Sequence, residues 1–300
     1  MIVVAGEALF DLVPQDLDGA LQGHAGGGPF NTARTLGRLE RPVAYLGRLS
    51  SDRFGARLEA QLAEDGVGLD SVVRTDEPTT LALAEVDAAG VARYRFYAGG
   101  TAAPGLTADA ALAALPAAFE MLHVGTLGLV FEPIASALEA VVERAEALVM
   151  VDPNCRPSAI EDVAAYRNRL SRILARSHVV KASEEDLAWL APDLPPVDGV
   201  REMLGHGPAL GLLTCGPSGA VVVTRTAEVV VPAPRAKVID TIGAGDAFSG
   251  GFLAWWDEHG RAREDLGTID LAVEATRFAC LVAARTCARP GASPPYRAEL

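Results

Sequence analysis

The stretch Asp240-Thr-Ile-Gly-Ala-Gly-Asp-Ala-Phe248 leads into an apolar run, Ser249-Gly-Gly-Phe-Leu253, that favours a helix. Small residues at the start of a helix leave its first backbone N–H groups unpaired and unshielded, and the helix dipole strengthens the anion site that they form. Asp246 falls in the first turn. A carboxylate there acts either as a cap for the N–H groups or as a catalytic base, and the local pattern leaves both roles open.

Two common nucleotide-binding loops do not fit the chain. Phe248 stands where the dinucleotide fingerprint needs a third glycine or an alanine. A P-loop needs a lysine directly after a glycine, and neither of the two lysines, Lys181 and Lys237, follows one. Fixed N–H donors beside a carboxylate suit phosphoryl transfer to an alcohol instead. The donors stabilise charge on the phosphoryl oxygens, and the carboxylate accepts the hydroxyl proton.

The composition sets broad limits on the protein's class. The chain has 300 residues, 50% of them hydrophobic, which suits one large α/β domain. Its net charge of −13 argues against a nucleic-acid partner, because phosphate binding needs a basic face. No apolar run approaches the roughly 18 residues of a membrane span, and the start of the chain resembles a buried strand rather than a signal peptide. We therefore expect no membrane partner and a cytoplasmic location.

Short apolar, β-branched runs alternate with amphipathic stretches of helical period, a pattern typical of βαβ units around a mostly parallel sheet. Arg53 to Asp65 is predicted to be a helix capped by Asp52, and Asn31 to Leu39 a helix that follows the glycine-rich segment Gly26 to Phe30. The predicted buried strands are Ile2 to Ala5, Val43 to Leu46, Met121 to Val124, Leu148 to Val151, Val179 to Lys181 and Leu210 to Thr214.

Two segments, Phe10 to Gly23 and Thr79 to Tyr97, have strand patterns with no helix between the strands. The second predicts a hairpin that turns at Asp87 to Gly90, with alternating apolar and basic residues in its second arm. Together they predict a small β lid, at about residues 10–23 and 79–98, on a single domain that spans residues 1–300. The edge strands of such a lid could pair in a homodimer.

Two motifs resemble those of a known family. Asp240-Thr-x-Gly-Ala-Gly-Asp-Ala-Phe248 resembles the C-terminal signature of the ribokinase (pfkB) family of carbohydrate kinases. Gly26-Gly-Gly-Pro-Phe-Asn-Thr-Ala33, followed by Tyr45-Leu-Gly-Arg-Leu-Ser-Ser-Asp-Arg-Phe-Gly55, resembles the N-terminal signature. The resemblance covers the whole chain. It implies a ribokinase-like α/β fold, with a mostly parallel central sheet flanked by helices and a small β-sheet lid over the sugar.

The resemblance makes Asp246 the catalytic base and Gly243, Ala244 and Gly245 the anion hole. ATP would be the phosphoryl donor, with Mg²⁺ as its metal. The segment Arg285 to Pro295 resembles the family's monovalent-cation loop, so activation by K⁺ is a further expectation. Much of such coordination comes from backbone carbonyl groups, which a sequence does not show.

The sugar-binding positions follow from the same resemblance. Asp11 matches the aspartate that holds sugar hydroxyls in this family, and a carboxylate can accept two hydroxyl groups at once. Gly27 and Asn31 match sugar-contacting positions of the glycine-rich segment. Each has a structural alternative, which is a tight turn for Gly27 and a polar residue at a helix start for Asn31.

The nucleotide and phosphate contacts match less distinctive motifs. Thr214-Cys-Gly-Pro-Ser-Gly219 resembles the family's nucleotide loop and makes Thr214, Gly216 and Gly219 its binding residues, although an ordinary hairpin turn fits the same pattern. Arg156 either neutralises phosphate charge or pairs with a surface carboxylate.

The metal site departs from the family pattern. Where the family has Asn-x-x-Glu near the metal and phosphates, this chain offers Ser183, as a nucleotide-binding residue, and Asp186, as a ligand of magnesium-bound water. Asp186 is one methylene shorter than glutamate, so Glu185 is an alternative. Acidic residues that simply open a helix fit this stretch equally well.

The lid bears on the choice of sugar. Kinases of this family that act on 2-keto-3-deoxygluconate resemble this chain near Tyr94-Arg-Phe-Tyr97, but they place an arginine where this chain has Ala98. Without that arginine the carboxylate of a sugar acid would be buried unpaired. Strand alternation should send Arg95 to the face opposite Phe96. A neutral sugar is therefore expected.

Two further segments narrow the expectation. The start Gly6-Glu-Ala-Leu-x-Asp11 and the segment Asp152-Pro-Asn-x-Arg156 are most similar to fructokinase, which makes D-fructose, phosphorylated at a primary hydroxyl, the predicted acceptor. A 2-keto-3-deoxygluconate kinase, a ribokinase and a nucleoside kinase are alternatives within the family. A non-catalytic sugar sensor on the same fold is the alternative outside enzymes.

Overall fold

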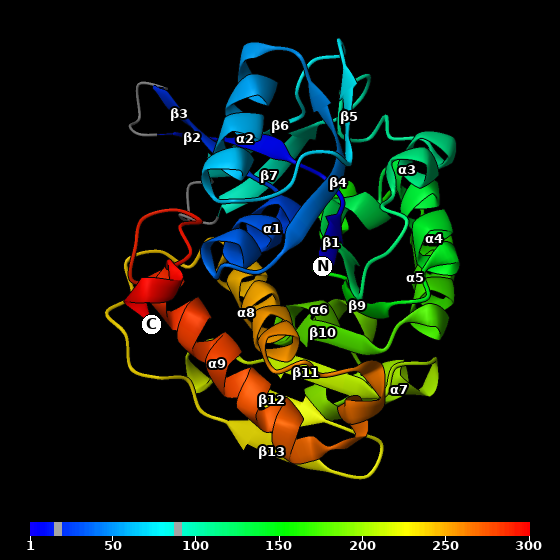
Figure 1. Ribbon diagram of the computed structural model, residues 1–300, viewed down its shortest axis with the longest axis vertical. Helices are drawn as coiled ribbons and strands as arrows, with labels where there is room; N and C mark the ends of the chain where they lie inside the picture. The colour runs from blue at the N-terminus through cyan, green and yellow to red at the C-terminus, as the bar shows by residue number, and fades with distance from the viewer. Residues whose placement is uncertain (15–19, 87–91) are drawn as a thin grey trace.

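The structure is a computed structural model that describes residues 1–14, 20–86 and 92–300, and its strands form two sheets (Figure 1). The large sheet has the strand order β13-β12-β11-β10-β9-β8-β1-β4-β5, and the small sheet has the order β3-β2-β6-β7. The strands are β1 Ile2–Ala5, β2 Leu9–Pro14, β3 Leu21–Gly26, β4 Val43–Ser50, β5 Val72–Thr75, β6 Leu81–Val86, β7 Ala92–Tyr97, β8 Met121–Gly125, β9 Leu148–Asp152, β10 Val179–Ser183, β11 Leu210–Thr214, β12 Ala220–Val223 and β13 Glu228–Val231.

The large sheet confirms the mostly parallel arrangement. Every neighbouring pair from β11 to β5 is parallel, and β12 and β13 add an antiparallel edge. All six predicted strands are present, but β4, β8, β9 and β10 run beyond their predicted ends. Their last residues, such as Gly125, Asp152 and Ser183, are small or polar, so a hydrophobic pattern does not include them.

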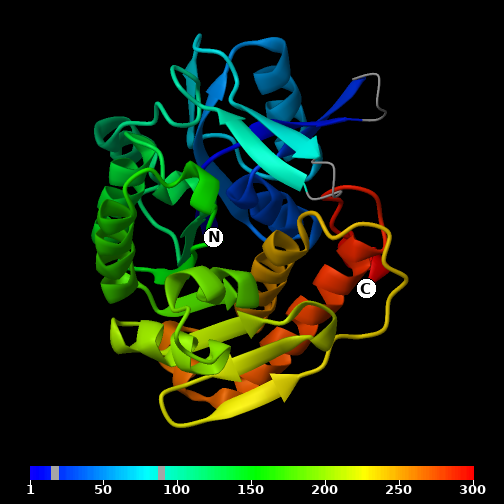
Figure 2. The ribbon, with the colours of Figure 1, turned by 180° about the vertical axis from the view of Figure 1, so that it is seen from behind.

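Helices cover both faces of the large sheet (Figures 1 and 2). Helices α1, α2, α8 and α9 pack on one face in a core that contains Phe30 and Phe252, and α3 to α7 pack on the other in a core that contains Leu138 and Leu170. The helices are α1 Gly28–Arg38, α2 Arg53–Glu64, α3 Ala108–Ala114, α4 Ile134–Arg144, α5 Val163–Arg176, α6 Glu184–Leu190, α7 Pro196–Gly205, α8 Ala244–Glu258 and α9 Ile269–Cys287.

The two helices predicted from their caps are both present. Asp52 caps α2, where its Oδ1 accepts the N–H of Gly55 at 2.8 Å. Helix α1 begins at Gly28 rather than at the predicted Asn31. Proline is tolerated in a first helical turn because its missing N–H would have no partner there, so Pro29 can belong to the helix.

The small sheet is the predicted lid. Pairs β2–β3 and β6–β7 are antiparallel, and β2 and β6 join them in parallel. The predicted turn at Asp87 to Gly90 lies outside the described residues. Phe96 of β7 lies on the body, with its ring 6.3 Å from that of Phe131, whereas Arg95 is exposed and pairs with Glu85. The two side chains therefore point to opposite faces, as predicted. Strands β3 and β7 are sheet edges, so a homodimer through the lid stays a prediction.

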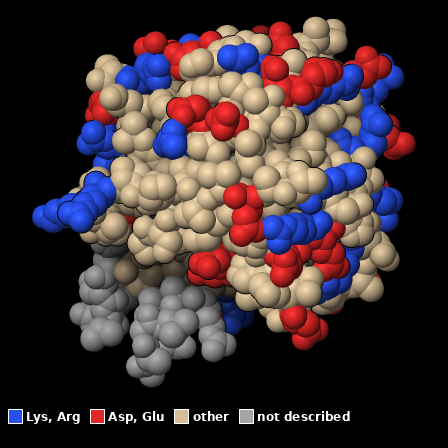
Figure 3. All heavy atoms as spheres, turned by 90° about the horizontal axis from the view of Figure 1, so that it is seen from below, with Lys and Arg blue, Asp and Glu red and all other residues tan. Residues whose placement is uncertain are grey.

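The surface mixes both signs of charge. On the face seen in Figure 3, acidic and basic side chains are interspersed, and no continuous band of Lys and Arg crosses the part of that face that the structure describes. None of the helices in the described ranges combines the length and the apolar character that a membrane crossing requires.

Candidate active site

Polar side chains gather at the carboxyl ends of the parallel strands. Strand β9 ends on Asp152, β10 on Ser183 and β11 on Thr214, and β1 leads through residues 6–8 into the lid strand β2. Helix α8 begins at the same edge, since Ser249 Oγ lies 3.4 Å from the Asp152 carboxylate. Ligands of open α/β sheets bind at this edge.

The N-terminus of α8 presents unpaired donors. Gly243 at the N-cap has φ +75°, a conformation that favours glycine, and its backbone makes the turn into the helix. The Ala244 N–H donates to the Thr241 carbonyl oxygen at 3.2 Å. In the described part of the chain, the N–H groups of Gly245 and Asp246 have no acceptor. These free donors and the positive end of the helix dipole suit a phosphoryl group.

The loop after α9 packs against these donors. The Gly291 N–H donates to Asp240 Oδ2 at 2.8 Å, and Asp240 Oδ1 accepts the Ile242 N–H at 3.0 Å. A Cβ atom on Gly243 would lie 2.6 Å from Cβ of Ala292, so the loop leaves room only for glycine. The shape of the anion hole therefore depends on this loop.

Two arginines of α1 hold the same loop. Arg34 and Arg38 form ion pairs with Asp65 at 2.6 and 2.7 Å. They also donate to the carbonyl oxygens of Ala292 and Pro294 at 3.1 and 2.6 Å. These two carbonyl groups of the predicted monovalent-cation loop already accept from guanidinium groups. Activation of the protein by K⁺ stays a prediction.

Asp246 is only 9% exposed, yet its carboxylate does not cap the helix. Its Oδ2 accepts from Nδ2 of Asn31 at 2.9 Å. Burial raises the pKa of Asp246 to about 6, and the Asn31 hydrogen bond and the charges of Lys181 and Arg156 act against this rise. A carboxyl group with a pKa near 6 is ionised at neutral pH and basic enough to accept a hydroxyl proton during reaction.

The start of α1 lies beside that carboxylate. Gly27 has φ +109°, and a Cβ there would lie 2.7 Å from the Glu7 carbonyl oxygen, so the turn itself requires glycine. Asn31 uses its amide nitrogen on Asp246, while its Oδ1 is buried with no hydrogen-bond partner in the described residues. A ligand hydroxyl would satisfy that oxygen. The turn explains the glycine at position 27, and a contact of Gly27 with the sugar stays a prediction. Asn31 has a role beyond the helix start, because it bonds to Asp246.

Asp11 of β2 faces the same space from the lid. Its side chain lies across Gly26, where a Cβ would be 2.1 Å from Asp11 Oδ2. Burial raises the pKa of Asp11 to about 6, the charge of Asp246 adds to the rise, and Arg156 opposes it. Burial and the charge of Asp11 raise the pKa of Tyr94 in β7, which Arg156 again opposes. These groups therefore lie near one another between lid and body.

Arg156 makes no surface ion pair among the described residues. Its Nη1 donates to the main-chain and side-chain oxygens of Asn154 at 3.1 and 2.7 Å and to the Cys155 carbonyl oxygen at 3.0 Å. The structure therefore does not support the alternative in which Arg156 pairs with a surface carboxylate. Its guanidinium charge lowers the pKa of three carboxyl groups of the site, Asp11, Asp152 and Asp246.

The sequence reasoning missed a buried ion pair. Lys181 Nζ lies 2.8 Å from Asp152 Oδ2, with the two side chains only 4% and 3% exposed. Burial opposes the charge on Lys181, but Asp152 raises the pKa of that lysine above its ordinary value. A lysine inside the apolar strand Val179–Ser183 was the available signal, because a buried lysine needs a charged partner.

Glu7 is a second missed residue. It is buried directly after β1, where Oε1 accepts the Gly28 N–H at 3.2 Å and Oε2 accepts the Gly128 N–H at 2.9 Å. Burial raises the pKa of Glu7 to about 8. Glu7 thus joins the start of α1 to the 3₁₀ turn Thr126–Leu129. The sequence signal for this residue was a glutamate close behind a fully buried strand, because a buried carboxylate needs hydrogen-bond donors.

Ser183 and Asp186 form a capping box at the start of α6. Asp186 Oδ2 accepts from the Ser183 N–H and Oγ at 2.8 and 2.7 Å, and Oδ1 accepts the Cys155 N–H at 2.6 Å. Asp186 is only 3% exposed, and Glu185 is exposed. In the described ranges no group of three or more His, Cys, Asp or Glu side chains could hold a metal ion. Both oxygens of Asp186 thus already accept hydrogen bonds from the protein, as the helix-opening alternative expects, and a contact of Asp186 with magnesium-bound water stays a prediction.

The predicted nucleotide loop is the turn between β11 and the antiparallel β12. Gly216 and Gly219 have φ +50° and +100°, and the Cys215 N–H donates to the Gly219 carbonyl oxygen at 2.8 Å. The backbone of this segment is therefore an ordinary hairpin turn, which was the alternative to a nucleotide loop. Thr214 also pairs with Ser183 across β11 and β10, which puts the turn at the ligand-binding edge.

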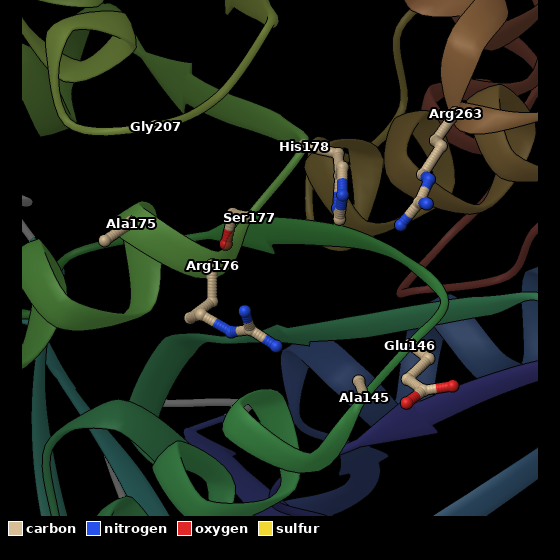
Figure 4. Close-up of a pocket in the computed structure, with 8 residues that line it drawn as sticks. All are labelled: Ala145, Glu146, Ala175, Arg176, Ser177, His178, Gly207 and Arg263. Atoms are coloured by element: carbon tan, nitrogen blue, oxygen red, sulfur yellow. The ribbon is translucent and has the colours of Figure 1, made fainter.

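A cavity of about 420 Å³ lies at the other end of the large sheet, where β9, β10 and β11 begin. Arg176 at the end of α5, His178 in the loop before β10 and Arg263 in a 3₁₀ turn surround it (Figure 4). None of the site residues predicted from the sequence lines this cavity, so it is not part of the candidate site.

The chain has clear relatives. The pattern of the family described as pfkB family carbohydrate kinase matches residues 1–299. A fructokinase of Rhizobium leguminosarum bv. trifolii is 37% identical over 259 residues, which cover 85% of this chain and 79% of the relative. A fructokinase of Klebsiella pneumoniae is 33% identical over 310 residues, which cover 100% and 97%. The crystal structure of fructokinase with bound ATP from Xylella fastidiosa superposes with a TM-score of 0.87 at 32% identity, over 97% of this chain and 93% of that one.

Proposed function

Because this chain belongs to the pfkB family of carbohydrate kinases and is an ATP-dependent sugar kinase, we propose that it phosphorylates D-fructose at a primary hydroxyl. The predicted family, fold class and enzyme class are confirmed. The observation that carries the site assignment is the buried carboxylate of Asp246, which does not cap its helix and lies beside the free N–H groups of α8.

In the proposed reaction the sugar hydroxyl approaches Asp246. As the hydroxyl oxygen bonds to the γ-phosphorus of ATP, its proton passes to Asp246, and the bond from that phosphorus to the bridging oxygen of ADP breaks. The products are ADP and the sugar phosphate, and Asp246 then releases its proton to solvent. The backbone of Gly243, Ala244 and Gly245 surrounds the phosphoryl oxygens, where the free N–H donors stabilise their charge.

The sugar contacts divide between lid and body. Asp11 would accept two hydroxyl groups of the sugar, and Oδ1 of Asn31 would accept another. Arg156, close to the site carboxylates, would face the transferred phosphoryl group. Ala98 is 8% exposed and supplies no cation for a sugar acid. A neutral sugar such as fructose, after which the relatives are named, fits this arrangement.

The nucleotide would lie along the turn formed by Thr214, Gly216 and Gly219, beside Ser183 at the same edge. Mg²⁺ usually binds through substrate phosphates and water, where it neutralises phosphate charge. Ser183 and Asp186 bond to each other in the capping box, and no step of the proposed mechanism depends on a metal held by them.

We expect kcat/KM for the sugar to fall as the pH falls through about 6. Asp246 must be ionised to accept the proton, and its pKa is raised by burial from 3.8 to about 6, so activity is present above this pH and lost below it. Asp11 has a pKa in the same range. A pH profile of the Asp11→Asn variant separates the two, because its acid limb persists if Asp246 is the source. A limb near pH 4 in the wild type would contradict this assignment.

The acceptor is tested by a coupled ADP-release assay with fructose, ribose, 2-keto-3-deoxygluconate and adenosine. We expect the highest kcat/KM with fructose, because no described lid cation is placed for a sugar-acid carboxylate. A higher value with another acceptor would replace fructose but keep the kinase. Tight sugar binding without turnover of any acceptor would favour a sensor and would contradict the role of Asp246.

A further inference from the structure

Lys181 stands out among the buried groups because it lies against the backbone of the anion hole. It projects from the middle of β10, and a Cβ atom on Gly245 would lie only 3.0 Å from Lys181 Nζ. The salt bridge to Asp152 at 2.8 Å fixes the ammonium group in this place. Asp152 is in turn touched by Ser249 of α8, at 3.4 Å. The ammonium is therefore held directly behind the second glycine of Gly243-Ala-Gly245.

Charges surround this ammonium from several elements. Carboxylates of β9, α6 and α8 all raise the pKa of Lys181, although burial acts against them, so the lysine stays protonated. His123 of β8 has the opposite response, since burial and the charge of Lys181 lower its pKa to about 3 and keep it neutral. The charges of Asp152 and Asp186 act on Lys181, and those of Asp152 and Arg156 act on Asp246. The charge of Asp246 in turn raises the pKa of Glu7 and Asp11.

We propose that Lys181 is a positioning residue of the reaction, whose fixed ammonium charge behind Gly245 makes the N-terminus of α8 attract the transferred phosphoryl group. This inference rests on the phosphoryl-transfer function proposed above. Free N–H donors hold only partial charges. A full charge at a fixed position adds electrostatic stabilisation without reorganisation during the reaction.

A purely structural role is the competing explanation. Lys181 also neutralises Asp152, and removing one partner of a buried pair leaves the other charge uncompensated. The two roles differ in what restores activity. If Lys181 only balances Asp152, then removing both charges should return kcat to the wild-type value. If the charge acts on the anion hole, the double variant should regain stability but not activity.

The test compares Lys181→Met, Lys181→Arg and the double variant Lys181→Met/Asp152→Asn with the wild type. The matched control is Lys237→Met, which removes the other lysine of the chain at an exposed position. For Lys181→Met we expect kcat to fall roughly 10²-fold, the size typical of losing one electrostatic contact to the reacting group. The sugar KM should stay within about threefold, because the hydrogen-bond partner of Lys181 is Asp152 and not one of the proposed sugar contacts Asp11 and Asn31. The acid limb of kcat should move to higher pH, since Lys181 lowers the pKa of Asp246.

The double variant keeps the test decisive if Lys181→Met folds poorly. We expect the double variant to melt at a higher temperature than Lys181→Met but to keep its low kcat. Lys181→Arg retains the positive charge and should therefore keep part of the wild-type kcat. Wild-type kcat in the double variant would overturn the proposal. So would a Lys181→Met protein with a lowered melting temperature but unchanged kcat and acid limb.

A binding measurement separates this proposal from the proposed function. Calorimetric titration of ADP with aluminium fluoride, a mimic of the transferred phosphoryl group, needs no turnover. We expect Lys181→Met to bind this mimic about 10²-fold more weakly than the wild type, with ADP alone changed little. Equal affinity for the mimic would overturn the role of Lys181. A wild type that turns over no sugar would instead overturn the proposed function, whatever the affinity ratio.

Discussion

Replacing Asp246 by asparagine should lower kcat by about 10²-fold or more and leave the sugar KM nearly unchanged, because a general base contributes about this much to the rate. Asparagine has the same shape and can still accept from Asn31 Nδ2, which is 2.9 Å from Asp246 in the native protein. It cannot take up the hydroxyl proton. The coupled ADP-release assay under saturating ATP measures both parameters.

The stability of this variant provides an independent check. Burial raises the pKa of Asp246 to about 6, so the ionised carboxylate disfavours the folded state at neutral pH. Asparagine removes that charge, and the melting temperature should equal or exceed that of the wild type. The matched control is Asp270→Asn, an exposed acidic residue in the first turn of α9, which should change neither kcat nor KM. An unchanged kcat in the Asp246 variant would reduce this residue to a structural one.

Replacing Asp11 by alanine should raise the sugar KM about 10²- to 10⁴-fold and change kcat far less. Hydrogen bonds to a charged group contribute about 1.5–3 kcal/mol each, and Asp11 is proposed to accept two hydroxyl groups. Calorimetric titration of fructose in the absence of ATP measures the loss as a change in Kd. It does not depend on turnover.

The lid offers a matched control for this variant. Glu85 lies in the neighbouring strand β6, on the outer face, where it pairs with the exposed Arg95. Glu85→Ala removes an acidic side chain from the lid without touching the site, so the sugar Kd should stay within about twofold, as for most surface changes. A loss of kcat at unchanged KM for Asp11→Ala would contradict its assignment to the sugar.

Local patterns were enough to predict the elements that make the frame. Ile2–Ala5 is apolar and mostly β-branched and Leu210–Thr214 is rich in leucine, so their burial could be predicted without knowing their partners. The glycine turn into α8 was predictable for the same reason, since its small residues and the helix that follows are adjacent in the chain, and its role as an anion hole stays a prediction. Arg95 and Phe96 were correctly assigned to opposite faces because alternation along a strand is local.

The remaining site residues depend on contacts between distant segments. Lys181 meets Asp152 from a neighbouring strand, and Glu7 meets Gly28 and Gly128 from two other segments. Neither pairing has a pattern in the sequence, because the register of parallel strands and the packing of helix starts decide it. Asp186 shows the converse. Its local pattern allowed a metal ligand or a helix cap, and the structure supplies the cap.

The hydrogen bond between Asn31 and Asp246 joins residues 215 positions apart. A chain made from its N-terminus at roughly 5–20 residues per second produces α1 about 10 to 40 seconds before Asp246 leaves the synthesis machinery. During that interval α1 can pack on β1, β4 and α2, but the part of its surface that finally packs on α8 lacks that partner. The nascent chain would thus hold Asp11 and Asn31, the proposed sugar contacts, well before Asp246 is made. This interval is also when the unfinished protein is most exposed to aggregation and most dependent on chaperones.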